Sequence, residues 1–190
     1  MAAVVIYDAC VLHPAPLRDL LIRIARTGLV RARWTDAILA ECFRSIMRRR
    51  PELQEPLKRT RELMNAAIPD CLVSGYEDLV ESLALPDPDD RHVLAAAIRS
   101  GASAIVTANL ADFPTQALAN YQIEAKHPDD FIVELIDSAP AVVLAAVTRQ
   151  AADLRSPPRS VSDLFETLQG VGLPMSVARL RELFGGQARG

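Results

Sequence analysis

Short apolar segments alternate with helix-length amphipathic segments along the first two thirds of this chain. Residues 3–7 form an uninterrupted apolar run, which predicts a strand buried on both faces of a sheet. Residues 16–27 carry apolar side chains at helical spacing, and Gly28 ends that predicted helix. Further short strands are predicted at residues 29–34, 104–107 and 122–125. Strands that alternate with helices favour an α/β fold of three layers (α/β/α), with helices on both faces of a central parallel sheet.

The helices between these strands are bounded by capping residues and prolines. Thr35 or Asp36 can cap the first of them. Farther along, Asp87 suits an N-cap and Pro88 the first helical position that follows it. The predicted helices span about residues 37–50, 51–67, 76–83 and 88–100.

Beyond Pro140 the pattern changes to helices only. Residues 141–154 are rich in apolar side chains, and Ser160 with Asp163 resembles the capping box of a second helix. A last helix carries a stripe formed by Val177, Leu180 and Phe184. We therefore predict two parts, an α/β domain at residues 1–138 and a C-terminal all-helical extension at residues 139–190.

The composition suits one globular domain with an appendage. The chain has 190 residues, half of them apolar, which is enough to bury a full core. No apolar run reaches the roughly 18 residues that a membrane span needs, and no basic-then-apolar leader precedes Val4. The cysteines lack paired zinc-binding spacing and indicate free thiols; they are Cys10, Cys42 and Cys71. We expect a cytoplasmic protein that does not enter a membrane.

The net charge of −3 conceals an asymmetry along the chain. Residues 1–61 carry 12 Lys and Arg against 6 Asp and Glu, whereas residues 62–190 carry 9 against 18. A basic N-terminal third would attract a polyanion such as RNA to a cluster of acids. The alternative is a solvated charge gradient without a function.

Two aspartates follow predicted strands, where a carboxylate faces a cleft or the protein interior. Asp8 comes directly after the first apolar run, and Asp112 follows the strand that ends near Thr107. Open parallel sheets bind ligands at the carboxyl ends of their strands. Thr107 and Asn109 are short polar side chains that can orient a metal ligand or a bound water. The alternatives are a turn aspartate at Asp8 and a loop aspartate at Asp112.

Asp90 lies near the start of a predicted helix. It precedes Val93 and Leu94 by one turn, which places it on the apolar face of that helix. It also suits the N3 position, where helices favour an acid, and both descriptions can hold together. His92 is expected on the opposite face, solvated and not a ligand.

Glu41 lies at one edge of the apolar stripe of the predicted helix 37–50. Arg44 and Arg48 share its side of the helix. Glu41 can reach a cleft from this position, or it can pair with one of the two arginines on the surface.

Four acids that accept the cost of leaving water usually share a cation. Oxygen ligands from carboxylates suit Mg²⁺ or Mn²⁺. The candidate catalytic and metal-binding residues are therefore Asp8, Glu41, Asp90 and Asp112.

With these acids in this order, the chain resembles the PIN-domain ribonucleases, particularly the VapC-type toxins of bacterial toxin–antitoxin pairs. The resemblance covers roughly residues 1–135, and its segments are residues 5–8, Glu41, residues 90–97 and residues 107–114. Residues 85–92 and the helical tail resemble the longer VapC-type subfamily. One departure is Cys10, where many members carry a small polar side chain. A thiol is a weak hydrogen-bond partner, so we expect weak support for Asp8.

The resemblance implies a PIN-like fold and Mg²⁺- or Mn²⁺-dependent hydrolysis of RNA, held in check by a cognate antitoxin. Asp8, Asp90 and Asp112 would bind one or two metal ions, with Glu41 as a further ligand or as the group that positions water. Candidates for binding the RNA backbone, or else solvated helix-end side chains, are Arg44, Arg48, Arg49 and Arg50. The helical tail would help bind the antitoxin or a second subunit of a homodimer or higher assembly, or would simply pack on the sheet.

Three other functions compete with this interpretation. A haloacid-dehalogenase-type phosphatase needs a second aspartate two residues after the first, and Cys10 stands there. A non-catalytic RNA-binding module with a PIN-like fold would normally have lost one of the acids. A housekeeping RNA-processing nuclease with the same chemistry is the more serious rival.

Overall fold

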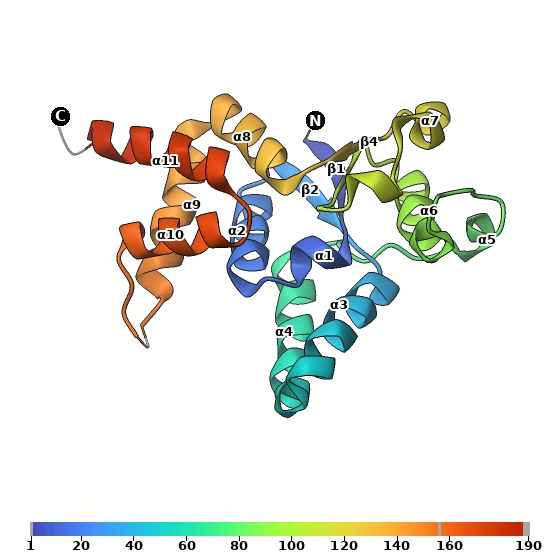
Figure 1. The fold of residues 1–190 in the computed structure, drawn as a ribbon, viewed down its shortest axis with the longest axis horizontal. Coiled ribbons are helices and arrows are strands. Elements are labelled where there is room, and N and C mark those ends of the chain that lie inside the picture. The colour runs from blue at the N-terminus through green and yellow to red at the C-terminus, as the bar shows by residue number, and fades with distance from the viewer. Residues whose placement is uncertain (1, 156, 188–190) are drawn as a thin grey trace.

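The computed structural model describes residues 2–155 and 157–187 and contains a central sheet of four strands (Figure 1). The strands are β1 (Ala3–Tyr7), β2 (Val30–Arg33), β3 (Ala104–Val106) and β4 (Glu124–Lys126). They are ordered β2-β1-β3-β4, and each neighbouring pair is parallel. The predicted α/β class with a parallel sheet is confirmed.

The α-helices connect these strands and continue beyond them. In the α/β part they are α1 (Ala9–Leu12), α2 (Ala15–Arg26), α3 (Asp36–Arg49), α4 (Gln54–Ala67), α5 (Glu77–Val80), α6 (Arg91–Ser100) and α7 (Thr115–Leu118). The C-terminal helices are α8 (Pro128–Ser138), α9 (Pro140–Asp153), α10 (Val161–Gly170) and α11 (Pro174–Gln187). Helices α3 and α4 extend away from the sheet at the bottom of Figure 1.

β1 lies at the centre of the core because it is apolar on both of its faces. Val5, Ile6 and Tyr7 are at most 2% exposed. The ring of Tyr7 stacks on Trp34 and meets Phe131 of α8 edge-on, with ring centroids 6.5 and 6.3 Å apart. Helix α6 contacts both β1 and β3. Burial of successive residues along β1 therefore reflects a sheet covered on both faces.

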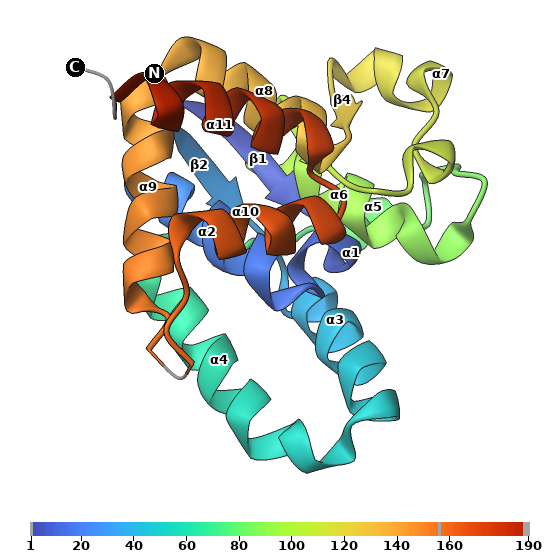
Figure 2. The ribbon, with the colours of Figure 1, turned by 60° about the vertical axis from the view of Figure 1, so that its left-hand side comes forward.

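The C-terminal helices pack on the α/β part rather than standing apart from it (Figure 2). Helix α9 contacts α2 and α8, and α11 contacts α8. The carboxylate of Asp129, in the first turn of α8, accepts hydrogen bonds from the backbone N–H groups of Met175 and Ser176 at 2.9 and 2.8 Å. These N–H groups belong to the first turn of α11, where a helix has no acceptors of its own. Asp129 therefore fixes the start of α11 against α8.

Several predicted elements differ from the structure. Helix α8 was not predicted, because the change to a purely helical pattern was placed after Pro140. The predicted strand 122–125 begins two residues later, since Gln122 has a left-handed backbone with φ 57°. The predicted stripe of the last helix is incomplete, since Phe184 is 41% exposed and meets Phe165 edge-on. The capping box of Ser160 and Asp163 is present as predicted.

None of the helices within the described residues is by itself long and apolar enough to cross a membrane. Helices α8 and α9 meet that criterion only when they are taken together, and they are bent by 120°.

Candidate active site

Asp8 stands at the carboxyl end of β1, directly after the buried Tyr7. It is 4% exposed and is the N-cap of α1, with its Oδ1 accepting a hydrogen bond from the backbone N–H of Ala9 at 2.6 Å. Its own N–H donates to the carbonyl of Val106 at 3.2 Å. The chain therefore turns from strand into helix at a buried carboxylate. Burying its ionised form costs free energy unless hydrogen bonds or a cation offset the loss of water.

The strand order places Asp8 at a branch point of the sheet. β2 lies on one side of β1 and β3 on the other, so the connections from β1 and from β2 run to opposite sides. Ligands of open α/β sheets bind outside the carboxyl ends of the strands at such a point. Thr107 directly follows β3 there, and its hydroxyl donates to Asp8 Oδ2 at 2.8 Å.

Cys10 also contacts the Asp8 carboxylate. Its Sγ donates to Asp8 Oδ2 at 3.1 Å and accepts a hydrogen bond from the backbone N–H of Ala108 at 3.2 Å. Burial raises the pKa of the Cys10 thiol to about 12, so the sulfur keeps its proton and remains a donor. The thiol therefore occupies the place of the small polar side chain whose absence we noted, and it does hydrogen-bond to Asp8.

The four predicted acids influence one another electrostatically. Burial raises the pKa of Asp8, and the charge of Glu41 raises it further. The pKa of Asp90 is raised to about 7, first by burial and then by several carboxylates; these are Asp8, Asp112, Asp87 and Glu41. Like charges raise the pKa of an acid in this way only when they are close to it. Residues from four separate segments of the sequence thus meet at one place.

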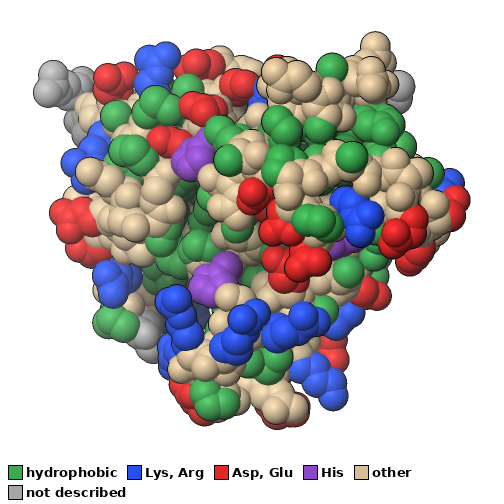
Figure 3. Space-filling view, turned by 45° about the vertical axis from the view of Figure 1, so that its right-hand side comes forward, with side chains coloured by type: hydrophobic (Ala, Val, Ile, Leu, Met, Phe, Trp, Pro, Cys, Tyr) green, Lys and Arg blue, Asp and Glu red, His purple; other side chains and the backbone are tan. Residues whose placement is uncertain are grey.

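Three of these acids line an open cleft of ≈ 580 Å³, which we call the acidic cleft. Glu41 enters it from α3, Asp90 from the 3₁₀ turn Pro88–Asp90, and Asp112 from the 3₁₀ turn Leu110–Asp112. Asp8 is buried and is not among the residues that line the cleft, although its charge reaches Asp90. Figure 3 shows acidic side chains gathered beside Lys and Arg side chains on one face of the molecule.

The predicted supporting residues are positioned differently from one another. Thr107 is fully buried and also accepts a hydrogen bond from the backbone N–H of Asn109 at 3.0 Å. Asn109 itself is exposed and lines the acidic cleft. Thr107 thus contacts Asp8, whereas Asn109 faces the space that a ligand would enter.

The predicted RNA-binding arginines divide into two pairs. Arg44 and Arg48 line the acidic cleft, on the same helix as Glu41. Neither forms an ion pair with any residue that the structure describes. Arg49 and Arg50 are not among the lining residues, and Arg50 pairs with Glu52 at 2.9 Å. Only Arg44 and Arg48 are placed to meet a phosphate at this cleft.

His92 does not lie on a solvated opposite face, so that prediction was wrong. Its side chain is 20% exposed, lines the acidic cleft, and places Nε2 3.5 Å from Glu41 Oε2. Its Nδ1 is buried and has no hydrogen-bond partner among the described residues. The prediction assumed that this helix has a solvated face opposite Val93 and Leu94, whereas Ala95 and Ala96 are also fully buried. Ala96 lies one turn from His92 on the same side of α6, so that side is covered as well.

The sequence argument also missed Asp87 and Asp89 as lining residues of the acidic cleft. Asp87 was recognised as an N-cap, and its Oδ1 does accept a hydrogen bond from the backbone N–H of Asp89 at 2.9 Å. The concentration of three aspartates within four residues was the signal that could have identified them. They add negative charge around Asp90.

The chemistry of this set fits a divalent cation. In the described part of the chain, Asp8, Asp90 and Asp112 have no ion pair with Lys or Arg, and Glu41 pairs only with His92. Their oxygens are the ligands that Mg²⁺ and Mn²⁺ favour. Within residues 2–155 and 157–187, no group of three or more His, Cys, Asp or Glu side chains is arranged so that it could hold a metal ion in this structure. A cation would remove the repulsion that raises the pKa of Asp90.

Comparisons with known proteins match both parts of the chain. A family model described as PIN domain matches residues 3–111, and one described as VapC50 C-terminal domain matches residues 128–182. The protein named Putative ribonuclease VapC50 from Mycobacterium tuberculosis (strain ATCC 25618 / H37Rv) is 36% identical over 134 residues, which cover 70% of this chain and 78% of that relative. No solved structure gives a significant match.

The two matched ranges can be compared with the positions of the candidate site residues and with the predicted domain division. The first contains Asp8, Glu41 and Asp90 and ends one residue before Asp112. The second begins with the first residue of α8. The division after residue 138 stays a prediction.

Proposed function

This chain belongs to the PIN-domain family, as a VapC-type ribonuclease with a C-terminal extension, and from that premise we propose that it hydrolyses RNA phosphodiester bonds with Mg²⁺ or Mn²⁺ in the acidic cleft. The observation that carries the proposal is that Glu41, Asp90 and Asp112, from three separate segments of the chain, line one cleft and form no ion pair with Lys or Arg among the described residues. Burial and the charges of the neighbouring carboxylates also raise the pKa of Asp90, and perturbed pKa values cluster at functional sites.

The four acids would hold the cation in a definite division of roles. Asp8, Asp90 and Asp112 would be its ligands, and Glu41 a further ligand or the group that orients the attacking water. The bound cation lowers the pKa of a coordinated water and neutralises charge that builds on the phosphate oxygens. Thr107 and Cys10 hold Asp8 through Oδ2, so the ligand deepest in the protein is fixed before substrate arrives.

Other side chains would position the RNA. Arg44 and Arg48 lack ion pairs among the described residues and line the same cleft, so they can bind backbone phosphates and draw RNA toward an otherwise repulsive acidic surface. In the hydrolysis, the water oxygen forms a bond to phosphorus while the bridging P–O bond breaks in line with it. No covalent intermediate with the enzyme is needed.

A toxin role follows from the VapC-type membership, and we propose that a cognate antitoxin neutralises the activity. A housekeeping RNA-processing nuclease would use the same acids, and a non-catalytic RNA-binding module would not need them. A neighbouring gene for a small DNA-binding protein favours the toxin role over the housekeeping one. Cleavage itself separates both from the non-catalytic module.

The direct test is RNA cleavage by the purified full chain. We expect degradation with Mn²⁺ or Mg²⁺, none with EDTA, and a loss of at least about 100-fold in Asp8→Asn and in Asp90→Asn. The exposed Asp130→Asn variant is the matched control and should cleave like the wild type. Undiminished cleavage by both site variants would refute the metal-site proposal.

A further inference from the structure

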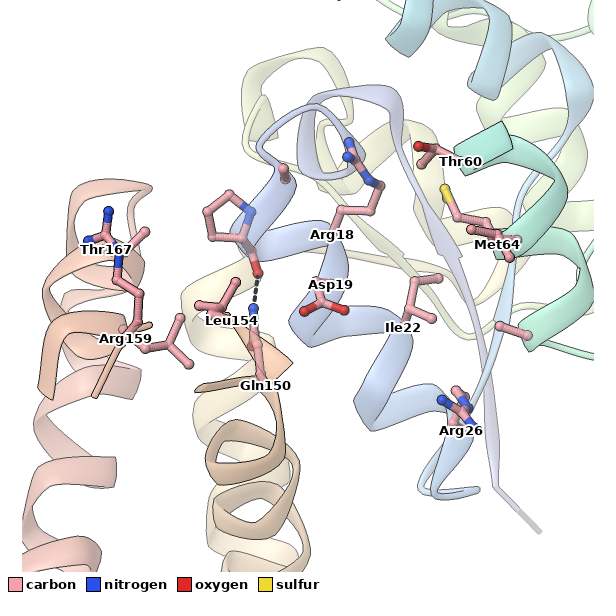
Figure 4. Close-up of a pocket in the computed structure, with 15 residues that line it drawn as sticks. Arg18, Asp19, Ile22, Arg26, Thr60, Met64, Gln150, Leu154, Arg159 and Thr167 are labelled. Carbon is pink, nitrogen blue, oxygen red and sulfur yellow. Dashed lines mark hydrogen bonds between the residues drawn. The ribbon is translucent and has the colours of Figure 1, made fainter. Parts of the chain in front are cut away.

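A second cleft lies where the C-terminal helices meet the α/β part, and we call it the seam cleft (Figure 4). Its volume is ≈ 670 Å³, and it is lined from α2, α4, α9, α10 and the segment between α9 and α10. It shares no lining residue with the acidic cleft. Its size falls within the range of about 300–1,000 Å³ that is usual for ligand pockets.

The walls of the seam cleft are apolar and continue onto the surface. Ile22 and Leu164 are buried in its depth, at 9% and 1% exposure. Leu63 and Leu154, in contrast, are 59% and 40% exposed. Large apolar side chains that continue from a cleft onto its rim mark a surface that buries against something else.

The charge available in the seam cleft is positive. Arg26 and Arg159 line it, are exposed, and form no ion pair with a residue that the structure describes. The one acid in its wall, Asp19, is already paired with Arg23 at 3.0 Å. A third arginine, Arg18, is occupied by backbone carbonyls of α1 and its C-cap. Arg26 and Arg159 can therefore meet an incoming carboxylate, although Arg159 already lies close enough to Asp163 for its charge to help lower the pKa of that acid.

A buried amide adds a hydrogen-bonding requirement. Gln150 is 2% exposed and lines the seam cleft, and its Nε2 donates to the carbonyl of Pro16 at 2.9 Å (Figure 4). Its Oε1 has no partner among the described residues. A buried acceptor without a donor costs free energy, so a donor from a bound segment that reached Oε1 would stabilise the complex.

We propose that the seam cleft binds a peptide segment of a partner protein, in which apolar side chains stand next to Asp or Glu. The apolar side chains would cover Leu63 and Leu154, the carboxylates would pair with Arg26 and Arg159, and the backbone N–H groups are donors of the kind that Gln150 lacks. RNA fits less well, because no aromatic side chain lines the cleft for base stacking. This binding is separate from cleavage and does not depend on it.

The test is a selection of random peptides displayed on phage against the full chain, followed by fluorescence polarisation with the enriched peptides. We expect enrichment of Leu, Ile or Val beside Asp or Glu. The double variant Arg26→Glu/Arg159→Glu should weaken binding at least about tenfold, and so should Leu63→Ser. Arg181→Glu is the matched control, since Arg181 is exposed on α11 and does not line the cleft.

Three outcomes would overturn the proposal. They are no enriched peptide, enrichment of basic peptides, and equal affinity of the double variant and the control. Displacement of the peptides by an RNA oligonucleotide from the wild type but not from the double variant would assign the cleft to RNA instead. RNA cleavage is measured separately on the same preparations, so failure here leaves the nuclease proposal standing, and the reverse also holds.

Discussion

Asp8 and Asp129 are buried to nearly the same degree, at 4% and 2% exposure, but their surroundings differ. The carboxylate of Asp129 is surrounded by donors, since it accepts from the N–H groups of Met175 and Ser176 and from the Ser176 hydroxyl at 2.6 Å. All its partners belong to the start of α11. It is a structural acid that joins two helices.

Asp8 also accepts hydrogen bonds, but other acids, Glu41 and Asp90, lie close enough to interact with its charge. The pKa of Asp8 is raised by burial and by the charge of Glu41, and Asp8 in turn helps to raise the pKa of Asp90 to about 7. Burial of a carboxylate is thus not sufficient to identify a functional site. The acidic cleft differs from the α8–α11 junction in that its carboxylates repel one another and form no ion pair with Lys or Arg among the described residues.

The largest effect on stability should come from the structural acid. Asp129→Ala leaves the backbone N–H groups of Met175 and Ser176 without their acceptor, whereas the Ser176 hydroxyl keeps the backbone carbonyl of residue 129 at 3.1 Å. Each buried donor without an acceptor costs about 1–3 kcal/mol. We expect the free energy of unfolding in urea to fall by about 3 kcal/mol. Asp130→Ala changes the exposed neighbour and should have little effect. Equal losses in the two variants would contradict the assigned role of Asp129.

Thr107→Val tests the support of Asp8 with a side chain of nearly the same shape. The carboxylate loses the hydroxyl donor at 2.8 Å, so we expect a loss of about 1.5 kcal/mol in stability and about tenfold slower RNA cleavage. Thr115→Val, at an exposed threonine, is the control. A Thr107→Val enzyme with wild-type cleavage would show that the hydroxyl does not position Asp8.

Asp90→Asn should raise the free energy of unfolding instead of lowering it, and by less than the other two substitutions lower it. The folded pKa of Asp90 is about 7 against an ordinary 3.8, so its ionisation destabilises the fold as pH rises through this interval. The full shift corresponds to about 4 kcal/mol, which we reduce to about 1 kcal/mol because solvent screens this partly exposed carboxylate. Asp90→Asn should therefore stabilise the protein by about that amount at pH 8 in EDTA.

The pH dependence supplies the control for that variant. The stabilisation should disappear near pH 4, where Asp90 carries its proton in the folded protein. Asp130→Asn, at an exposed aspartate that does not line the acidic cleft, should change stability little at either pH. A destabilised Asp90→Asn at pH 8 would mean that repulsion does not dominate at this residue.

Periodicity and strand ends were enough to predict the parallel sheet and to select Asp8. The apolar run before Asp8 required a covered strand, and ligands bind at the ends of such strands. The angle of Glu41 on its helix allowed either a position beside a cleft or a surface pair with Arg44 or Arg48, and the structure has it in the cleft. These are local properties, which a single sequence carries directly.

The features that were missed depend on geometry that the sequence pattern does not contain. His92 was misplaced because the helix that carries it is covered on more than one face, as the full burial of Ala95 and Ala96 shows. Asp129 gave no signal because its partners, Met175 and Ser176, are more than 40 residues away in the chain. The seam cleft likewise requires knowledge of how α9 and α10 pack on α2.

The central claim, that the four carboxylates share a divalent cation, is tested most directly by calorimetric titration of the metal-free full chain with Mn²⁺. The account predicts saturable binding by the wild type and by Asp130→Asn, with binding weakened at least about tenfold in Asp8→Asn and in Asp90→Asn. Equal Mn²⁺ affinity in all four proteins would contradict it.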